Sequence, residues 1–266
     1  MRLWALFQAT EVRSKKISGV IIADPYLMNE ENLKHEEGRR RMKSYLLDFM
    51  QQNKVKNFLL VPYRPMYVLL WLYTFTFVPF LHICCHVSKF VTLSWLRYVY
   101  SVLRNNHWVL LVLRPQRCNC YLLDSTKSPG KDWSLLKDLL DDCLFDWNTT
   151  RGHTVEKNYK GSGKKMIAFR WNTLSCMQQP RTSLTCDFYA RIQMKKFIWS
   201  TKMLNQHDKI LKWGQEVQNN HPETGLVLEE LQVKLAAIIN KEVRSSFGLF
   251  YNNFKEDESN QQKSLT

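Results

Sequence analysis

The amino-acid sequence predicts a globular protein of the α+β class, because strand-like and helix-like segments both occur along its 266 residues. Short apolar runs that end at proline or at a polar turn are typical of buried strands, whereas apolar residues at three- and four-residue spacing are typical of helices. Hydrophobic residues make up 45% of the chain, which is enough to fill a core. The length suggests one large domain or two small ones.

Five segments have the composition of strands, with β-branched and aromatic residues in short runs. The first is stopped by Pro25, and the second, NFLLVPY, is apolar enough to be buried. The third and fourth flank a polar turn at Pro115-Gln116 and are predicted to pair as an antiparallel hairpin. The five segments are the run IIADP that ends at Pro25, then 57–63, 107–113, 118–124 and 166–176.

Four segments have the apolar spacing of helices. In the first, Met42, Tyr45, Leu46 and Phe49 recur at three- and four-residue intervals, which predicts an amphipathic helix. Its basic run GRRRMK is open to two interpretations, a nuclear-import patch or a solvated helix face, and the helix face is preferred. The four predicted helices span 30–53, 131–147, 186–199 and 226–244.

The chain is strongly basic. It has 38 Lys and Arg against 24 Asp and Glu, which gives a formal net charge of +14. Such a charge favours an acidic partner, whether nucleic acid, a membrane surface or an acidic protein, without choosing among the three. We predict no specific nucleic-acid partner.

Seven cysteines are spread irregularly along the chain, and an odd number suits a disulfide framework poorly. The opening run MRLWALF is too short to act as a signal peptide before the charged residues that follow. We therefore expect a reducing compartment, nuclear or cytoplasmic, in which the thiols are free. In that setting a single cysteine in suitable surroundings can act as a nucleophile.

An apolar stretch without formal charge runs through 65–88. Its length allows a transmembrane helix over 66–87, which would tether the protein to a membrane. Pro79 argues against a span, and so do the two flanks, which belong to one predicted sheet and must return to the same compartment. We therefore expect 65–105 to be a re-entrant or surface-looped insertion. A stretch that is normally untranslated is a further alternative.

A candidate metal site lies inside this stretch, at His82, Cys84, Cys85 and His86. Adjacent cysteines suit the tetrahedral geometry of zinc poorly when no more distant partner is evident. We predict neither a metal nor an organic cofactor.

The predicted hairpin carries an imidazole at the start of its first strand and a carboxylate at the end of its second. A register symmetric about Pro115-Gln116 places His107 directly opposite Asp124, with Cβ atoms roughly 5 Å apart. At that separation the carboxylate can hold the imidazole by a hydrogen bond and fix its tautomer. The alternative is a chance polar pair at a strand end, satisfied by solvent.

A nucleophile for such a pair is available in Cys186. This cysteine follows the turn-forming run QQPRTSLT and opens the predicted helix 186–199. The helix N-terminus and a neighbouring imidazolium both stabilise a thiolate, which predicts a lowered pKa for the Cys186 thiol. Ahead of Cys186, at the start of this run, Gln178 and Gln179 carry amides that could donate to an oxyanion. Cys143 and Cys176 fit better as small buried cysteines.

The order of these residues resembles a known family. His107-Trp108, the Leu-Asp-Ser that ends at Ser125, the Gln-Gln-Pro that starts at Gln178 and the Cys186 that precedes Phe-Tyr occur in this sequence in that order. They resemble the ubiquitin-like-protein-specific (SUMO-deconjugating, Ulp-type) cysteine proteases, especially the plant copies associated with transposable elements. The resemblance covers about 20–63 and 106–254, and includes ADPYLMNEEN, LLVPY, HWVLLVLRP, YLLDSTK, CMQQP and LFYNNF.

The resemblance implies a papain-like cysteine protease fold, with a mixed, mostly antiparallel sheet flanked by helices. It implies one protease domain over 1–254, interrupted by the insertion 65–105 and followed by a polar tail at 255–266. His107 resembles the general base, Asp124 its orienting carboxylate and Cys186 the nucleophile.

Two further roles follow from the same resemblance. Gln179 resembles the residue of the oxyanion hole, and Gln178 is the second choice because its spacing to the cysteine varies. Trp108 resembles the tryptophan that lines a narrow tunnel for the Gly-Gly tail of the substrate, where only glycines leave room for close aromatic walls.

The implied function is that of a cysteine-type peptidase or isopeptidase that cleaves after the C-terminal glycine of a ubiquitin-like, SUMO-like modifier. The implied partners are this modifier and its conjugates. The alternatives are a degenerate copy that only binds a ubiquitin-like protein, and a membrane-tethered variant.

Two features depart from the family pattern. The insertion 65–105 separates LLVPY from His107, which the family joins by a few residues. Asp187 stands where the family has glycine, directly after the cysteine. A carboxylate there opposes the charge of both thiolate and oxyanion, so we expect weak turnover by the unmodified chain.

Overall fold

The structure of the protein is a computed structural model that describes residues 1–65, 107–126, 131–150, 167–179, 186–219, 224–245 and 247. The chain forms two compact units, Met1–Asn219 and Asn220–Thr266. The second unit contains α9 (Thr224–Ile238), which continues as a π-helix over Ile239–Arg244. The predicted extent of one domain to residue 254 stays a prediction, and the predicted tail 255–266 lies outside the described residues.

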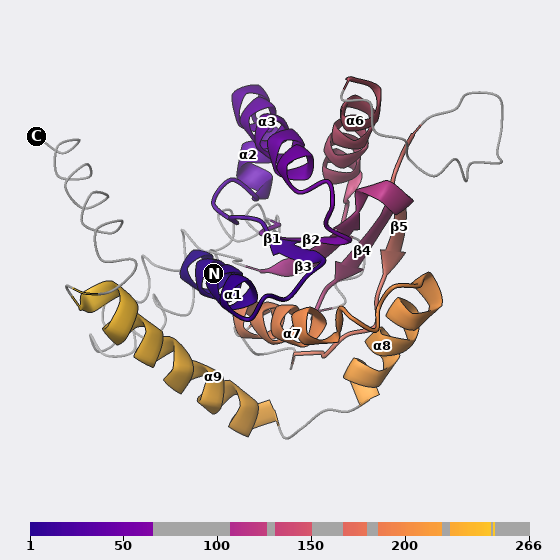
Figure 1. Ribbon diagram of the computed structural model, residues 1–266. Helices are drawn as coiled ribbons and strands as arrows, with labels where there is room; N and C mark the ends of the chain where they lie inside the picture. The colour runs from indigo at the N-terminus through magenta and orange to yellow at the C-terminus, as the bar shows by residue number, and fades with distance from the viewer. Residues whose placement is uncertain are drawn as a thin grey trace, which may run out of the picture. The chain divides into compact units, whose positions relative to one another are not determined.

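A five-stranded sheet forms the centre of the first unit, with its strands in the order of the sequence (Figure 1). The two inner interfaces, β2–β3 and β3–β4, are antiparallel, whereas the outer interfaces β1–β2 and β4–β5 are parallel. This arrangement confirms an α+β fold with a mixed sheet. The strands are β1 (Val20–Ile22), β2 (Phe58–Tyr63), β3 (Val109–Arg114), β4 (Asn119–Leu123) and β5 (Arg170–Thr173).

Helices cover both faces of this sheet (Figure 1). On one face lie α2 (Glu30–Lys34), α3 (Glu36–Gln52) and α6 (Ser134–Thr150), and on the other lie α1 (Arg2–Ser14), α7 (Cys186–Ser200) and α8 (His207–Asn219). The helices that flank the sheet agree with the predicted architecture.

The strands β2, β3 and β4 are buried along their whole length, because both faces of the sheet are covered. Alternate residues therefore enter two separate cores. Leu59, Val61 and Leu111 join the core beneath α3 and α6. On the other face, the Phe58 ring contacts Phe197 of α7 edge-on, at 5.1 Å between centroids.

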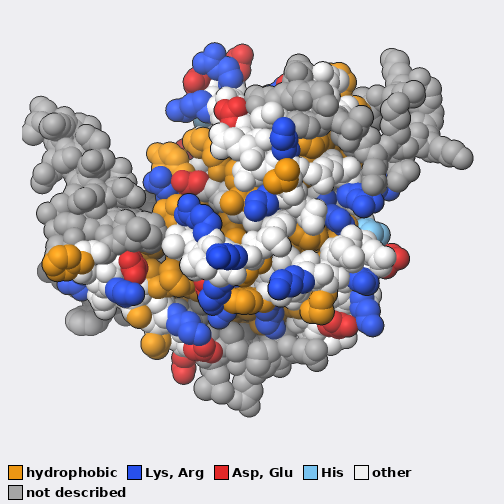
Figure 2. All heavy atoms as spheres, viewed as in Figure 1, with side chains coloured by type: hydrophobic (Ala, Val, Ile, Leu, Met, Phe, Trp, Pro, Cys, Tyr) orange, Lys and Arg blue, Asp and Glu red, His pale blue; other side chains and the backbone are white. Residues whose placement is uncertain are grey.

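The basic run GRRRMK forms part of the surface of α3. Arg39 pairs with Asp142, and Lys43 pairs with Asp146, so ion pairs cross from α3 to α6. Arg40 is 76% exposed. These contacts agree with the interpretation as a solvated helix face. Figure 2 shows Lys and Arg side chains spread widely over one face of the molecule, with a smaller number of Asp and Glu among them.

The predicted helix 30–53 is wrong in one respect, since it is broken at His35. The backbone of His35 is extended (φ −100°, ψ 134°), and the chain turns there between α2 and α3. The close approach of the two helices requires Gly38, since a Cβ at that position would lie 2.4 Å from the carbonyl oxygen of Asn32.

Two helices were not predicted. α1 occupies most of a segment for which only the terminal strand was expected, and it buries Trp4, Ala5, Gln8 and Val12 along one stripe. α8 also has a clear helical stripe, which ends at Val217. Both helices have 13 residues, against 17 in α3 and in α6, so each shows fewer apolar repeats along the sequence.

The predicted register of the hairpin is wrong by two residues. Pro115–Arg117 form a 3-10 turn, and Cys118 closes it in the left-handed conformation at φ 49°. The longer turn pairs Arg114 with Asn119. Extended past the strand ends, this register places Thr126 opposite His107, with Asp124 diagonal to it. A shift of two residues leaves each side chain on its predicted face, because side chains alternate with period two.

Residues 66–106 lie outside the described residues, and they include all but the first residue of the predicted insertion 65–105 and the candidate metal cluster at His82, Cys84, Cys85 and His86. In the part of the chain that the structure describes, no helix combines the length and apolarity needed to cross a membrane.

Candidate active site

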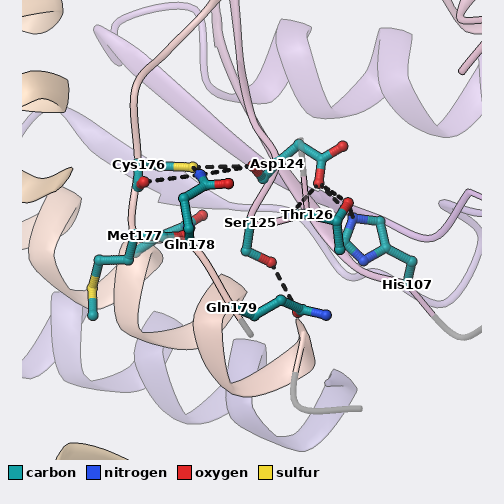
Figure 3. A network of polar contacts seen from close by, with 9 residues as sticks. His107, Asp124, Ser125, Thr126, Cys176, Met177, Gln178 and Gln179 are labelled. Carbon is teal, nitrogen blue, oxygen red and sulfur yellow. Dashed lines mark hydrogen bonds and ion pairs between the residues drawn. The ribbon is translucent and has the colours of Figure 1, made fainter. Parts of the chain in front are cut away.

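His107 and Asp124 form a buried hydrogen-bonded pair at the ends of β3 and β4 (Figure 3). Nε2 of His107 lies 2.7 Å from Oδ1 of Asp124, and the two side chains are only 6% and 7% exposed. The two residues lie just outside their strands, so the rigid central sheet fixes the backbone from which each side chain extends. The diagonal arrangement thus achieves the contact that direct opposition was expected to give.

Thr126, which was not among the predicted site residues, completes this arrangement. Its backbone N–H donates to Oδ1 of Asp124 at 2.9 Å, and its hydroxyl approaches the same oxygen at 2.7 Å. The hydroxyl also lies 3.2 Å from Nε2 of His107. The turn motif Asp-Ser-Thr could have indicated this role, since an Asp side chain often accepts from the backbone two residues further on.

The pKa of Asp124 is lowered from its ordinary value. Burial alone would raise the pKa, but the hydrogen bond and charge of His107, together with the two donors of Thr126, outweigh it. The carboxylate is therefore ionised at neutral pH. It accepts from Nε2–H of His107, which leaves Nδ1, on the other edge of the ring, as the basic nitrogen.

Cys186 is the first residue of α7 and is 6% exposed. Its thiol pKa is raised to about 11, first because of burial and also because of the charge of Asp187. Backbone hydrogen bonds from Trp108, Asp187 and Cys186 itself act in the opposite direction. The predicted lowering of this pKa is thus wrong, because burial outweighs the helix N-terminus. The contact with Trp108 brings the sulfur beside the backbone that carries His107.

Asp187 forms an ion pair with Arg191, one helical turn further on in α7. Oδ2 of Asp187 lies 3.1 Å from Nη2 of Arg191, whose side chain is only 6% exposed. The guanidinium also lies over the ring of Phe188, at 5.1 Å from its centroid. Arg191 therefore offsets part of the negative charge that the sequence placed beside the nucleophile. The i,i+4 spacing in a predicted helix could have indicated the pair.

The two glutamines occupy different environments beside Asp124 and Ser125 (Figure 3). Nε2 of Gln178 donates to the carbonyl oxygens of Cys176 at 3.0 Å and Asp124 at 3.4 Å. Gln179 instead accepts from the Ser125 hydroxyl through Oε1 at 3.2 Å, and its backbone N–H donates to the Ser125 carbonyl at 3.0 Å. Ser125 therefore orients the Gln179 side-chain amide so that its oxygen faces the Ser125 hydroxyl and its nitrogen lies on the other side.

Trp108 follows His107 directly and lines a pocket of about 390 Å³. Tyr26, Leu27 and Asn29 contribute to the same pocket. Trp108 therefore borders a cavity, and its predicted role in lining a substrate channel stays a prediction.

The predicted site residues thus form two groups, which are linked because His107 and Trp108 are adjacent in the sequence. The structure joins His107 to Asp124 by a hydrogen bond, and joins Cys186 to Trp108 through the backbone. The predicted separation of roughly 4–5 Å between the Cys186 sulfur and a His107 ring nitrogen stays a prediction. Within the described ranges, no cluster of three or more His, Cys, Asp or Glu side chains could hold a metal ion.

Comparisons with known proteins give distant structural similarities. No protein-family model matches the chain, and no curated protein matches it. Among solved structures, it is similar to the SUMO protease Ulp1 with its catalytic cysteine oxidised to a sulfenic acid, at 11% identity and a TM-score of 0.43, over 82% of this chain and 74% of that one.

Two further solved structures give similar values. The C-terminal Ulp1 protease domain in complex with Smt3, the yeast ortholog of SUMO, is 12% identical with a TM-score of 0.43, over 79% of this chain and 71% of that one. A de-sumoylating protease is 12% identical with a TM-score of 0.41, over 90% and 82%. At such low identities, the chemistry of the site has to be inferred from the residues of this chain.

Proposed function

We propose that the protein is a cysteine-type peptidase or isopeptidase that cleaves after the C-terminal glycine of a ubiquitin-like, SUMO-like modifier. The observation that carries the proposal is the buried His107–Asp124 pair, whose neighbour Trp108 donates a backbone hydrogen bond to the Cys186 thiol. A base, its orienting carboxylate and a thiol at a helix N-terminus are the components of cysteine-based acyl transfer. The motif order further suggests the type associated with plant transposable elements.

In the proposed reaction, Nδ1 of His107 takes the proton of the Cys186 thiol as the sulfur attacks the glycine carbonyl carbon. The carbonyl oxygen becomes an oxyanion, to which the Gln179 side-chain amide and the backbone N–H of Cys186 donate. His107 then protonates the leaving amine, and the C–N bond breaks to leave a thioester. Water, deprotonated by His107, hydrolyses the thioester and regenerates the thiol.

Asp124 has a distinct part in this cycle. His107 carries a positive charge after it takes the thiol proton, and the ionised Asp124 stabilises that charge at 2.7 Å. Because the thiol pKa is about 11, the resting site holds a neutral thiol, and proton transfer has to accompany the attack. The His107–Asp124 pair is therefore needed for nucleophilicity as well as for departure of the amine.

A second candidate function is binding of a ubiquitin-like protein without cleavage. The raised thiol pKa and the carboxylate of Asp187 favour it, because reactive cysteines ordinarily have lowered pKa values. On this hypothesis the tail of the modifier enters the site and no thioester forms.

An electrophilic probe distinguishes the two functions. SUMO with a C-terminal propargylamide in place of its last glycine is incubated with the full chain, and intact-mass and peptide mass spectrometry follow the adduct. A peptidase forms a covalent adduct on Cys186, which Cys186→Ala abolishes. Cys118→Asn, which removes a distant thiol and suits the left-handed backbone there, retains the adduct. Binding without an adduct supports the second function. If the probe neither binds nor forms an adduct, both functions are overturned.

A further inference from the structure

We infer that the pocket beside Trp108 binds an acidic side chain in the tail of the modifier, immediately before its terminal glycines, and that Arg64 recognises it. The inference rests on the proposed function, because it takes Trp108 to line the channel for the terminal glycines, as the resemblance implies. It specifies which modifier tails the site prefers.

The pocket has a cationic lining. Its volume is about 390 Å³, and three arginines border it together with Tyr26, Asn29 and Trp108. The arginines are Arg2, Arg41 and Arg64. None of the described residues that line the pocket is acidic. A cavity with this lining attracts a carboxylate and disfavours a Lys or Arg side chain.

Arg64 extends into this site from a fixed backbone. Its N–H donates to the carbonyl of Met28 at 3.0 Å, and its own carbonyl accepts from the N–H of Glu30 at 3.0 Å. These two bonds hold the end of β2 against the start of α2. Within the described part of the chain, the Arg64 guanidinium takes part in no hydrogen bond or ion pair. Its charge is therefore available to a ligand.

The other two arginines are less available. Nε of Arg2 binds Oδ2 of Asp24 at 3.1 Å, and its guanidinium lies 4.9 Å from the centroid of the Tyr26 ring. Arg41 is 61% exposed and lies 3.9 Å from a carboxylate oxygen of Glu37. The two raise the positive potential around the pocket, whereas Arg64 is the residue able to make a bidentate contact with a carboxylate.

The pocket adjoins the proposed nucleophile through a single residue. Trp108 lines the pocket, and its backbone binds the Cys186 thiol. A peptide whose glycines pass along Trp108 therefore continues into the pocket with the residues that precede them. An extended chain advances about 3.3 Å per residue, so a cavity of this size holds roughly two or three residues.

Peptide binding to the Cys186→Ala protein tests this inference independently of catalysis. Fluorescein-labelled peptides that end in Gly-Gly carry two Glu, two Gln or two Lys residues directly before the glycines, and fluorescence anisotropy gives each Kd. We expect the Glu peptide to bind about tenfold more tightly than the Gln peptide, as for a charge-assisted hydrogen bond, and the Lys peptide to bind most weakly. The preference should decrease as salt is added.

A second substitution assigns the preference to Arg64. Arg64→Gln in the same Cys186→Ala protein should reduce the difference between the Glu and Gln peptides to less than about twofold, with binding of the Gln peptide unchanged. Arg13→Gln is the matched control, since Arg13 is an exposed arginine of α1 outside the pocket lining. This control should retain the full preference.

Each other outcome overturns the inference. Equal binding of the three peptides, or no binding of any, would show that the pocket does not read an acidic tail. If Arg64→Gln weakens binding of the Glu and Gln peptides equally, Arg64 has a structural role only. The proposed function fails separately, through the absence of a Cys186 adduct with the SUMO probe.

Discussion

The carboxylate of Asp187 and the guanidinium of Arg191 form an ion pair of 3.1 Å across the first turn of α7, directly after the Cys186 thiol. The pair stabilises the carboxylate of Asp187, at a position where the Ulp-type proteases that the sequence resembles have glycine. Asp187 nevertheless raises the pKa of Cys186, in addition to the larger effect of burial. Asp187 is therefore a position at which a substitution can change the charge beside the Cys186 thiol without altering the cysteine itself.

Asp187→Asn should increase hydrolysis of a fluorogenic ubiquitin-like substrate by about tenfold, because it removes one negative charge beside the thiolate and the oxyanion. The side-chain amide oxygen of this variant can still accept from Arg191. Asp187→Gly should give a similar or larger increase and also lower the free energy of unfolding by about 1–3 kcal/mol, since it leaves a buried guanidinium without its partner. No increase in either variant would show that Asp187 does not limit the site.

The insertion 65–105 should limit turnover together with Asp187. We expect weak or absent hydrolysis by the unmodified chain, and an increase of about 10²–10³ when Asp187→Gly is combined with removal of 65–105. Addition of Cys186→Ala should abolish the gain. Robust turnover by the unmodified chain, or no gain from the combined change, contradicts this prediction.

Reaction of Cys186 with iodoacetamide should increase with pH up to about pH 11, because only the thiolate reacts. At pH 8 about one molecule in a thousand carries the thiolate by this pKa. The raised pKa also means that the buried thiol favours folding below pH 9 and that this contribution is lost between pH 9 and 11. Peptide mass spectrometry of the Cys186 peptide against pH measures the titration. A midpoint at or below about pH 8 would show that the pKa of the Cys186 thiol is not raised.

Thr126→Val should weaken the His107–Asp124 pair without changing either of its two residues. The change removes the hydroxyl that lies 2.7 Å from Oδ1 of Asp124, so the pKa of Asp124 should rise toward its ordinary value. The stability from this lowered pKa is present above the unfolded-state pKa and is lost as pH falls through the folded-state value, so acid unfolding should begin at higher pH. At neutral pH we expect a loss of about 1–2 kcal/mol by thermal denaturation.

The matched control for this variant is Thr126→Ser, which retains the hydroxyl. It should unfold with acid as the native protein does. Equal acid sensitivity in both variants would show that the hydroxyl of Thr126 is not responsible for the acid stability of the pair.

Gly214→Ala should destabilise the segment that carries the two glutamines. A Cβ on Gly214 of α8 would lie 2.7 Å from the backbone oxygen of Ser175, which is too close without a shift. We expect a loss of about 1–3 kcal/mol in urea denaturation, as for overpacking. Gln215→Ala, at an exposed position of the same helix, should change the stability little. An equally stable Gly214→Ala protein would mean that α8 can move away.

The sequence was most informative where one regular pattern decided the structure. The apolar runs of β2, β3 and β4 and the spacing in α3 and α6 predicted those elements, because the strands are covered on both faces and each of these helices packs one face against the sheet. The hairpin was found but not its register, since the turn depends on Cys118 in a left-handed conformation that residues other than glycine rarely adopt. The His107–Asp124 contact nevertheless forms, because the error of two residues preserved the alternation of faces.

The electrostatic properties of the site were harder to predict. A helix N-terminus lowers a thiol pKa, and this effect can be read from the sequence. The burial of Cys186 depends on how the folded chain packs around it, and it reverses the direction of the shift. Thr126 and Ser125 were missed for a related reason, since their roles depend on which oxygen of Asp124 or Gln179 faces them.

The rate at which the SUMO propargylamide probe labels Cys186 in a double-mutant cycle tests most directly whether His107 and Asp124 act with Cys186 as one unit. We expect His107→Ala to slow labelling by about 10²–10⁴, Asp124→Asn also to slow it, and the double variant to be little slower than His107→Ala alone. Circular dichroism confirms that each variant is folded. Labelling by His107→Ala at the native rate, or fully additive losses in the double variant, would show that the pair does not act with Cys186 as one unit.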